Sequence, residues 1–166
     1  MINKGLFTSD KQDWETPQDL YDKLDGEFNF TLDPCASHEN HKCKKYYTIE
    51  DDGLSKSWLG ETVFMNPPYG REIGDWVKKA YSESRSGKAT VVGLLPARTD
   101  TKWFHNYCYL YDVEIRFLKG RIKFSGSKNS APFPSMVVIY SSINKQSKRT
   151  SIDTKQKRIK TGSSKP

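Results

Sequence analysis

Apolar positions follow two different spacings along this 166-residue chain, and each spacing predicts a different kind of element. Residues 71–86 carry apolar side chains every three or four positions, which predicts an amphipathic helix. Residues 89–95 instead form an unbroken run of small and β-branched side chains, the pattern of a strand covered on both faces. Thr62–Met65 predicts a second buried strand, which must end at the two prolines that follow it.

Shorter patterns fill the rest of the chain. Residues 17–25 predict a helix, because Pro17 suits the first helical position and Thr16 before it is a good N-cap. Glu27–Leu32 alternates polar and apolar positions and predicts a strand that runs into Asp33-Pro34. We also expect strands near Lys44–Thr48, Val113–Lys119 and Ser135–Tyr140, and a helix around residues 101–110.

Strands that alternate with helices predict an α/β fold with a mostly parallel central sheet and flanking helices. Ligands of such sheets bind at the carboxyl ends of the strands. Three predicted strands end in loops of unusual composition, namely Asp33-Pro34, Asn66–Tyr69 and Pro96–Arg98. We therefore expect these three loops to form one site at the same edge of the sheet.

The run Asn66-Pro67-Pro68-Tyr69 is the most informative of these loops. Its prolines make a rigid corner, with an amide side chain before them and an aromatic ring after them. The Asn66 side-chain oxygen and the Pro67 carbonyl are two acceptors suited to the exocyclic amino group of a nucleobase. Tyr69 offers a face on which the base would stack. The alternative is a stiff turn without chemistry, since Asn-Pro is a common turn opener.

Net charge divides the chain into two parts. Residues 142–166 carry the whole formal charge of +7, and residues 1–141 are neutral overall. The basic part has no aromatic residue and is rich in Ser, Thr and Gln, which predicts a disordered tail after a single domain of residues 1–141. Such a tail is suited to binding a nucleic acid, although a basic tail that only improves solubility has the same composition.

Cysteine number and hydropathy bear on location and metals. The three cysteines are an odd number without framework spacing, which indicates reduced thiols in a cytoplasm. We expect a soluble, intracellular protein, because the sequence has no long apolar run and no signal peptide. Cys35, His38, His41 and Cys43 resemble metal ligands. Four ligands within nine residues leave little chain to close a tetrahedral site, so we predict no metal.

Seven short motifs follow one another along the chain: Trp14–Pro17, Leu32–Ala36, Asp52–Leu54, Phe64–Tyr69, Leu94–Arg98, Gly120–Phe124 and Ala131–Met136. In these motifs and their order the chain resembles the phage-type DNA adenine-N6 methyltransferases, which are short Dam-like enzymes. The resemblance covers roughly residues 14–140. It implies a Rossmann-like methyltransferase fold, S-adenosylmethionine as methyl donor, double-stranded DNA as partner and an adenine that leaves the duplex before methylation. It also implies a role in modifying phage or prophage DNA against restriction.

The resemblance also implies the site residues. The catalytic residues would be Asn66, Pro67, Pro68 and Tyr69. The donor would be bound by Trp14, Thr16, Pro17, Asp33, Pro34, Cys35, Asp52, Leu54 and Asn66. DNA would be contacted by Arg98, Arg121, Lys123, Lys148 and Arg149. One departure is that the loop 33–37 lacks the Gly-x-Gly with which many methyltransferases let the backbone approach the donor closely.

Other functions fit the same residues. An amine-binding corner also suits N4-methylation of cytosine, and RNA or a protein glutamine are further substrates for such chemistry. A non-catalytic DNA-binding protein with the same fold would keep the basic tail without using the corner.

Overall fold

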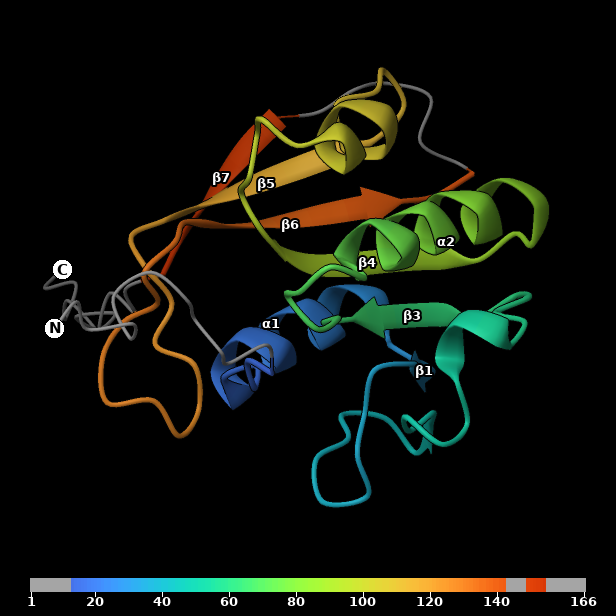
Figure 1. The fold of residues 1–166 in the computed structure, drawn as a ribbon, viewed down its shortest axis with the longest axis horizontal. Helices are drawn as coiled ribbons and strands as arrows, with labels where there is room; N and C mark the ends of the chain where they lie inside the picture. Colours follow the sequence, from blue (N-terminus) through green and yellow to red (C-terminus); the bar gives the residue numbers. More distant parts are fainter. Residues whose placement is uncertain (1–12, 143–148, 155–166) are drawn as a thin grey trace, which may run out of the picture.

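A seven-stranded sheet forms the centre of the computed structural model, which describes residues 13–142 and 149–154 (Figure 1). The strands are β1 (Leu32–Asp33), β2 (Lys45–Tyr46), β3 (Thr62–Met65), β4 (Thr90–Pro96), β5 (Glu114–Lys119), β6 (Ser135–Tyr140) and β7 (Arg149–Asp153). Their order in the sheet is β2-β1-β3-β4-β6-β5-β7. β6 is antiparallel to both of its neighbours, and all other adjacent strands are parallel. The predicted α/β fold with a mostly parallel sheet is confirmed.

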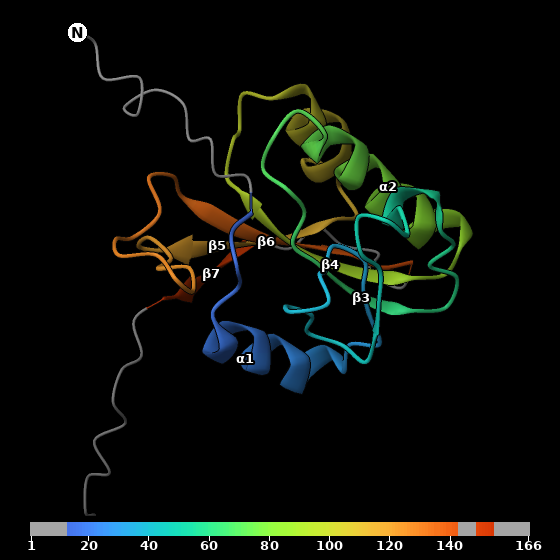
Figure 2. The ribbon, with the colours of Figure 1, turned by 60° about the horizontal axis from the view of Figure 1, so that its bottom comes forward.

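Helices cover both faces of this sheet (Figure 2). α1 (Gln18–Phe28) lies on one face, and α2 (Ile73–Ser86) lies on the other beside the π-helical turn η3 (Phe104–Cys108). A 3-10 turn, η2 (Gly53–Ser55), follows β2 in the chain. The predicted helix over 71–86 is confirmed to within two residues. The helix expected around residues 101–110 forms as a short helical segment over 102–108, which is π-helical from Phe104 to Cys108.

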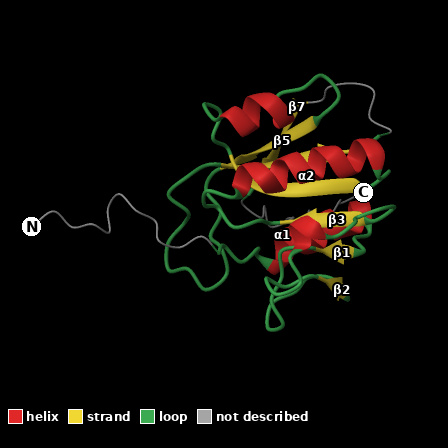
Figure 3. Ribbon diagram, turned by 45° about the vertical axis from the view of Figure 1, so that its right-hand side comes forward, coloured by secondary structure: helices red, strands yellow, loops and turns green. Residues whose placement is uncertain are grey.

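The hydrophobic core follows from the central position of β4 and β6. Every residue of β6 is buried, and so is every residue of β4 after Thr90, as its apolar sequence predicts. α2 runs along the sheet in Figure 3 and buries Ile73, Trp76, Val77 and Ala80. Among the described residues, no helix combines the length and apolar character needed to cross a lipid bilayer. The three cysteines are free thiols, as predicted.

The start of the chain corrects two sequence predictions. Helix α1 continues to Phe28 and ends at Asn29, whose left-handed backbone (φ 55°) and N–H bond to the Asp25 carbonyl terminate it. The strand expected from Glu27 is therefore only Leu32–Asp33. The apolar alternation arises because Phe28 and Phe30 stack on each other beside the helix, at 5.9 Å between ring centres. Thr16 makes no capping bond, since Pro17 occupies the N-cap position.

The end of the chain corrects a third prediction. Residues 149–153, which we expected within a disordered tail, form strand β7 parallel to β5. The physical reason is that β5 offers an edge of unpaired backbone groups to the new strand, and Ile152 of β7 packs against the hydrophobic core. Arg149 secures the new strand by donating to the Val113 carbonyl over 2.6 Å. The other residues of the predicted tail between 143 and 148 and after 154 lie outside the described part of the chain.

Candidate active site

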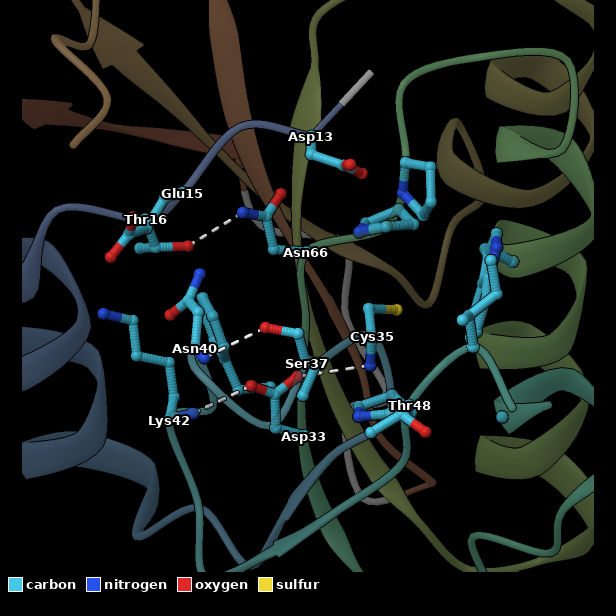
Figure 4. A pocket seen from close by; sticks show the side chains of 18 of the residues that line it. Asp13, Glu15, Thr16, Asp33, Cys35, Ser37, Asn40, Lys42, Thr48 and Asn66 are labelled. Carbon is cyan, nitrogen blue, oxygen red and sulfur yellow. Dashed lines mark hydrogen bonds between the residues drawn. The ribbon is translucent and has the colours of Figure 1, made fainter. Parts of the chain in front are cut away.

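A cavity of about 660 Å³ opens at the carboxyl ends of the parallel strands (Figure 4). The loops after β1, β2 and β3 line it, together with the segment 13–16 that precedes α1. Two of the three predicted loops, at Asp33-Pro34 and Asn66–Pro68, therefore meet in one site. Residues 96–98 are not among its lining residues. The cavity contains the predicted donor-binding residues Trp14, Thr16, Asp33, Pro34, Cys35, Asp52, Leu54 and Asn66.

Asn66 lies at the end of β3, where the two prolines stop the strand. Its side-chain nitrogen donates to the Trp14 carbonyl over 2.5 Å and to the Thr16 hydroxyl over 2.9 Å. Its side-chain oxygen Oδ1 is buried, and within the described residues it has no hydrogen-bond partner. Buried acceptors are nearly always satisfied, so an unpaired one in a cavity wall indicates a missing donor. In Figure 4 the amide oxygen points away from Thr16.

Asp33 organises the loop that follows β1. The residue is only 5% exposed, and its two carboxylate oxygens accept the backbone N–H groups of Cys35 (3.2 Å) and Lys42 (2.9 Å). Burial raises the pKa of the Asp33 carboxyl, and the two backbone donors act in the opposite direction. The carboxylate therefore folds residues 34–42 around itself at the cavity wall. Each oxygen keeps a further lone pair with which it can accept a cationic ligand group.

The missing Gly-x-Gly of this loop has a counterpart elsewhere in the cavity. Gly53, at the start of η2, is buried against the same loop, and a Cβ atom built on it would lie 2.4 Å from the Pro34 carbonyl oxygen. The Gly53 carbonyl in turn accepts the indole N–H of Trp58 over 3.1 Å. A close backbone approach therefore does occur in the cavity wall, between the loops after β1 and β2.

The acidic run Glu50-Asp51-Asp52 separates into two roles. Glu50 and Asp51 accept hydrogen bonds from Thr48, and these bonds lower the pKa of both carboxyls. Asp52 lines the cavity, with a left-handed backbone (φ 55°), and no described residue donates a hydrogen bond to its carboxylate. Asp52 is thus the member of the run that is available to a ligand.

Two residues predicted for the site do not line the cavity. Pro17 lies at the start of α1, outside the set of lining residues. Tyr69 is only 6% exposed, and its hydroxyl donates to the Leu94 carbonyl over 2.7 Å. The rings of Phe124 and Phe133 meet Tyr69 edge-on, at 6.4 and 5.6 Å. Base stacking by Tyr69 stays a prediction, and the ring has a structural role in addition.

The residues predicted to contact DNA occupy different environments. Arg98, Arg121 and Lys123 are exposed, and the alternation with buried Ile122 and Phe124 turns the last two outward. Arg149 instead donates to the Val113 and Leu110 carbonyls and lies 5.6 Å from the Tyr109 ring centre. Lys148 lies outside the described residues.

The residues considered as metal ligands make contacts with other side chains and do not converge on one point. His41 stacks on Tyr46 at 4.0 Å between ring centres, while Cys43 is buried against the Tyr21 hydroxyl. Cys35 lines the cavity, and burial raises the pKa of its thiol. Within residues 13–142 and 149–154, no group of three or more Cys, His, Asp or Glu side chains could hold a metal ion.

Sequence comparison with known proteins assigns the chain to a family. The sequence profile of the DNA N-6-adenine-methyltransferase (Dam) family matches residues 4–164, nearly the whole chain. The chain belongs to this family. The mostly parallel sheet with helices on both faces is consistent with the Rossmann-like methyltransferase fold that the resemblance implied.

Two phage relatives named DNA N-6-adenine-methyltransferase support the assignment. The relative from Haemophilus phage HP1 (strain HP1c1) is 33% identical over 149 residues, which cover 84% of each chain. The relative from Escherichia phage T1 is 38% identical over 106 residues, or 61% of this chain and 43% of the relative. The match therefore spans more than four fifths of the first relative and less than half of the second.

Sequence reasoning missed several residues that shape this Dam-family site. Phe124 and Phe133 both pack against the ring of the predicted residue Trp14, each at 5.2 Å between ring centres, and Ser125 donates its N–H to the Glu15 carbonyl. Trp76, interpreted only as a core residue of α2, also lines the cavity. Other lining residues that were not predicted are Asp13, Glu15, Ala36, Ser37, Asn40, Lys42, Thr48, Ile49, Gly53, Phe64, Glu72 and Ser125. Glu15, Ala36, Gly53 and Phe64 lie within the motifs quoted from the sequence but were not assigned to the site. The positions of the others depend on contacts between distant segments.

Proposed function

We propose that this chain transfers a methyl group from S-adenosylmethionine to the exocyclic N6 amine of an adenine in double-stranded DNA. Membership of the Dam family supports the reaction class. The observation that carries the proposal is the Asn66 amide, whose Oδ1 is a buried acceptor without a donor among the described residues, beside a cavity at the strand ends. An adenine amine is a donor of the kind that this oxygen lacks.

The reaction depends on orienting a weak nucleophile. The N6 lone pair of adenine is delocalised into the ring, so the free amine attacks poorly. Asn66 Oδ1 and the Pro67 carbonyl, which accepts no hydrogen bond from the described residues, would accept the two N6 hydrogens. These bonds favour a pyramidal nitrogen with its lone pair directed at the methyl group. Positioning and electrostatics then suffice, and no covalent bond to the protein is needed.

The cavity fits a donor with a cationic amino-acid end and a nucleoside end. When bound, S-adenosylmethionine supplies an electrophilic methyl group on a sulfonium. Asp33 would hold the methionine portion, with Trp14, Pro34 and Cys35 around it. Asp52 and Leu54 would hold the nucleoside end, where the available Asp52 carboxylate suits hydroxyl donors. The volume of about 660 Å³ lies within the range of small-molecule sites.

DNA approaches the same edge of the sheet in this proposal. The exposed cations Arg98, Arg121 and Lys123 follow β4 and β5, and we infer that they contact backbone phosphates. The target adenine would leave the stack to reach Asn66, with Tyr69 as its stacking partner. Modification of phage or prophage DNA against restriction is the biological role that we propose. The protein would then act in the cytoplasm of a bacterial host.

One experiment tests the reaction and its main alternatives together. Duplex DNA is incubated with the protein and S-adenosylmethionine, digested to nucleosides and analysed by mass spectrometry. We expect N6-methyladenine, whereas N4-methylcytosine would assign the amine chemistry to the other base. Absence of both, with no donor binding in calorimetry, would indicate a non-catalytic DNA-binding protein.

The Asn66→Ala variant tests the mechanism. We expect its turnover to fall by about 100-fold or more, because it removes an oriented acceptor of the kind used in preorganised sites. The dissociation constant for S-adenosylmethionine should change by less than about threefold, because Asn66 acts on the substrate amine and not on the donor. Turnover equal to that of the unmodified protein would contradict the mechanism.

A further inference from the structure

The Asn66 amide has two possible orientations, and its neighbours admit only one. An amide nitrogen has two hydrogens, and here both are used, on the Trp14 carbonyl (2.5 Å) and the Thr16 hydroxyl (2.9 Å). A half-turn of the amide would place Oδ1 against the Trp14 carbonyl, where two acceptors face each other. It would also turn N–H groups toward a substrate amine that needs acceptors. The two contacts therefore select the orientation that leaves Oδ1 for the substrate.

The segment that makes this selection is itself held firmly. Thr16 is 2% exposed, and the Trp14 ring packs against Phe124 and Phe133 of the connector from β5 to β6. The Glu15 carbonyl accepts the Ser125 N–H over 3.0 Å. Because both neighbours of Glu15 contact Asn66, residues 14–16 form a fixed clamp on the amide. The clamp comes from some 50 residues earlier in the chain.

We propose that Thr16 is a positioning residue that sets the orientation of the Asn66 amide, and that the Trp14 carbonyl makes an amide rather than a carboxylate necessary at position 66. A carboxylate has no hydrogen to donate, so the Asn66→Asp substitution would bring an oxygen against the Trp14 carbonyl. This inference rests on the proposed function of Asn66. It differs from the donor-binding role expected for Thr16, because it acts on turnover rather than on donor affinity.

Thr16→Val and Thr16→Ser separate the two roles. Valine keeps the shape of threonine without its hydroxyl, whereas serine keeps the hydroxyl. We expect Thr16→Val to lower kcat about fivefold to tenfold, the factor that corresponds to one neutral hydrogen bond. The dissociation constant for S-adenosylmethionine, from calorimetry, should change by less than about twofold, because the lost hydrogen bond is made to Asn66 and not to the donor. Thr16→Ser should restore most of the lost kcat.

A spectroscopic measurement reports the amide without relying on activity. The side-chain amide signal of Asn66 in a ¹H–¹⁵N spectrum is identified by its loss in Asn66→Ala. One of its two proton signals should shift in Thr16→Val and return in Thr16→Ser. An unshifted signal, or an unchanged kcat with a raised donor dissociation constant, would overturn the positioning role.

Asn66→Asp provides a second test that does not require Thr16→Val to fold. The protonated carboxyl of this variant can donate to the Trp14 carbonyl, whereas the ionised form cannot. The kcat of Asn66→Asp relative to the unmodified protein at the same pH should therefore rise at least about tenfold between about pH 8 and pH 5.5, since more of the carboxyl is protonated. A ratio that is flat with pH would overturn the selection of an amide. If the unmodified protein methylates nothing, the proposed function fails, and the amide signals still decide the orientation.

Discussion

The Tyr69 hydroxyl donates to the main-chain carbonyl of Leu94 over 2.7 Å, which joins the corner after β3 to the adjacent strand β4. Tyr69 ends the rigid run that begins at Asn66, so this bond holds the far end of the corner. Its buried ring also meets Phe133 and Phe124, which in turn hold Trp14. The tyrosine thus connects the two parts of the site, the corner and its clamp.

Removing only the hydroxyl of Tyr69 tests that connection. Tyr69→Phe should lower the free energy of unfolding by about 1 kcal/mol, the contribution of one neutral hydrogen bond. Tyr69→Ala should lower it by about 3–5 kcal/mol, because it also leaves a cavity in the aromatic cluster. Urea unfolding measures both values. If the ring stacks on the target base, Tyr69→Phe keeps most of the turnover and Tyr69→Ala loses it. Equal stabilities of Tyr69→Phe and the unmodified protein would show that the bond contributes nothing.

Gly53 should be intolerant of any side chain. The Cβ atom of Gly53→Ala would lie 2.4 Å from a backbone oxygen, at Pro34, which cannot move as a flexible side chain would. We expect a loss of about 1–3 kcal/mol in unfolding free energy, as for other overpacked sites, and a raised donor dissociation constant. Calorimetry with S-adenosylmethionine and urea unfolding give the two values.

Gly26 is the matched control for this substitution. It lies within α1, and a Cβ atom on it would meet nothing within 4 Å. Gly26→Ala should therefore stabilise the protein by about 0.5–1 kcal/mol, because alanine favours the helix more than glycine does. Its donor affinity should match that of the unmodified protein. A Gly53→Ala variant that behaved like Gly26→Ala would mean that the two loops do not need their close approach.

Asp51 and Asp52 are adjacent, yet their substitutions should affect different properties, stability for Asp51 and donor binding for Asp52. Asp52→Asn should weaken donor binding, about tenfold for one lost hydrogen bond to a charged group, with little change in melting temperature. Asp51→Asn should lower the melting temperature, because the Asp51 carboxylate accepts the Thr48 N–H over 2.8 Å. Calorimetry and thermal unfolding distinguish the two. A donor affinity unchanged by Asp52→Asn would remove Asp52 from the binding residues.

The Asp51 bonds also predict the sign of a pH dependence. Hydrogen bonds from the Thr48 backbone N–H and hydroxyl hold the pKa of Asp51 below its ordinary value of 3.8. A lowered pKa in the folded state contributes stability above the unfolded value and loses it as the pH falls through the folded value. The difference in melting temperature between the unmodified protein and Asp51→Asn should therefore shrink below about pH 4. A difference that stays constant down to about pH 2 would contradict this assignment.

Local patterns predicted what depends on neighbours in the sequence. The strand Thr62–Met65, the helix near 71–86 and the corner at Asn66 all follow from periodicity and from the backbone limits of proline. The predictions of Thr16 as a helix cap and of Phe30 within a strand were wrong for one common reason. Thr16 bonds to Asn66 rather than to its own helix, and Phe30 packs on Phe64 rather than continuing a strand. Both partners are distant in the sequence, so tertiary contacts overrode the local preference.

The same reason explains the limits at the site. The side chains that face the cavity from Asp33 and Asn66 were found because each follows a predicted strand. The packing of Phe124 and Phe133 on Trp14 was not predicted, since aromatic residues in loops have no periodicity that indicates their partners. Gly53 could have been suspected as a close-approach glycine. Only the position of Pro34 shows which segment approaches it.

Salt dependence should separate the two groups of basic residues that the sequence predicted for DNA binding. Arg121 and Lys123 are exposed, whereas the Arg149 guanidinium is engaged by the Val113 and Leu110 carbonyls. Each lost phosphate contact reduces the slope of log K against log salt by about 0.9. The Arg121→Ala/Lys123→Ala variant should therefore bind duplex DNA more weakly, with a slope smaller by about 1.8. Fluorescence anisotropy over a series of salt concentrations measures the slope.

Arg149→Ala serves as the comparison, because it removes one positive charge from a residue that anchors β7. We expect a lower melting temperature and a slope equal to that of the unmodified protein, since its charge neutralises no phosphate in this arrangement. A slope reduced by about 0.9 in Arg149→Ala would instead mean that the arginine leaves the Val113 carbonyl to contact DNA. An unchanged slope in the Arg121→Ala/Lys123→Ala variant would place the DNA on another surface of the domain, because lost phosphate contacts cannot leave the salt dependence unaltered.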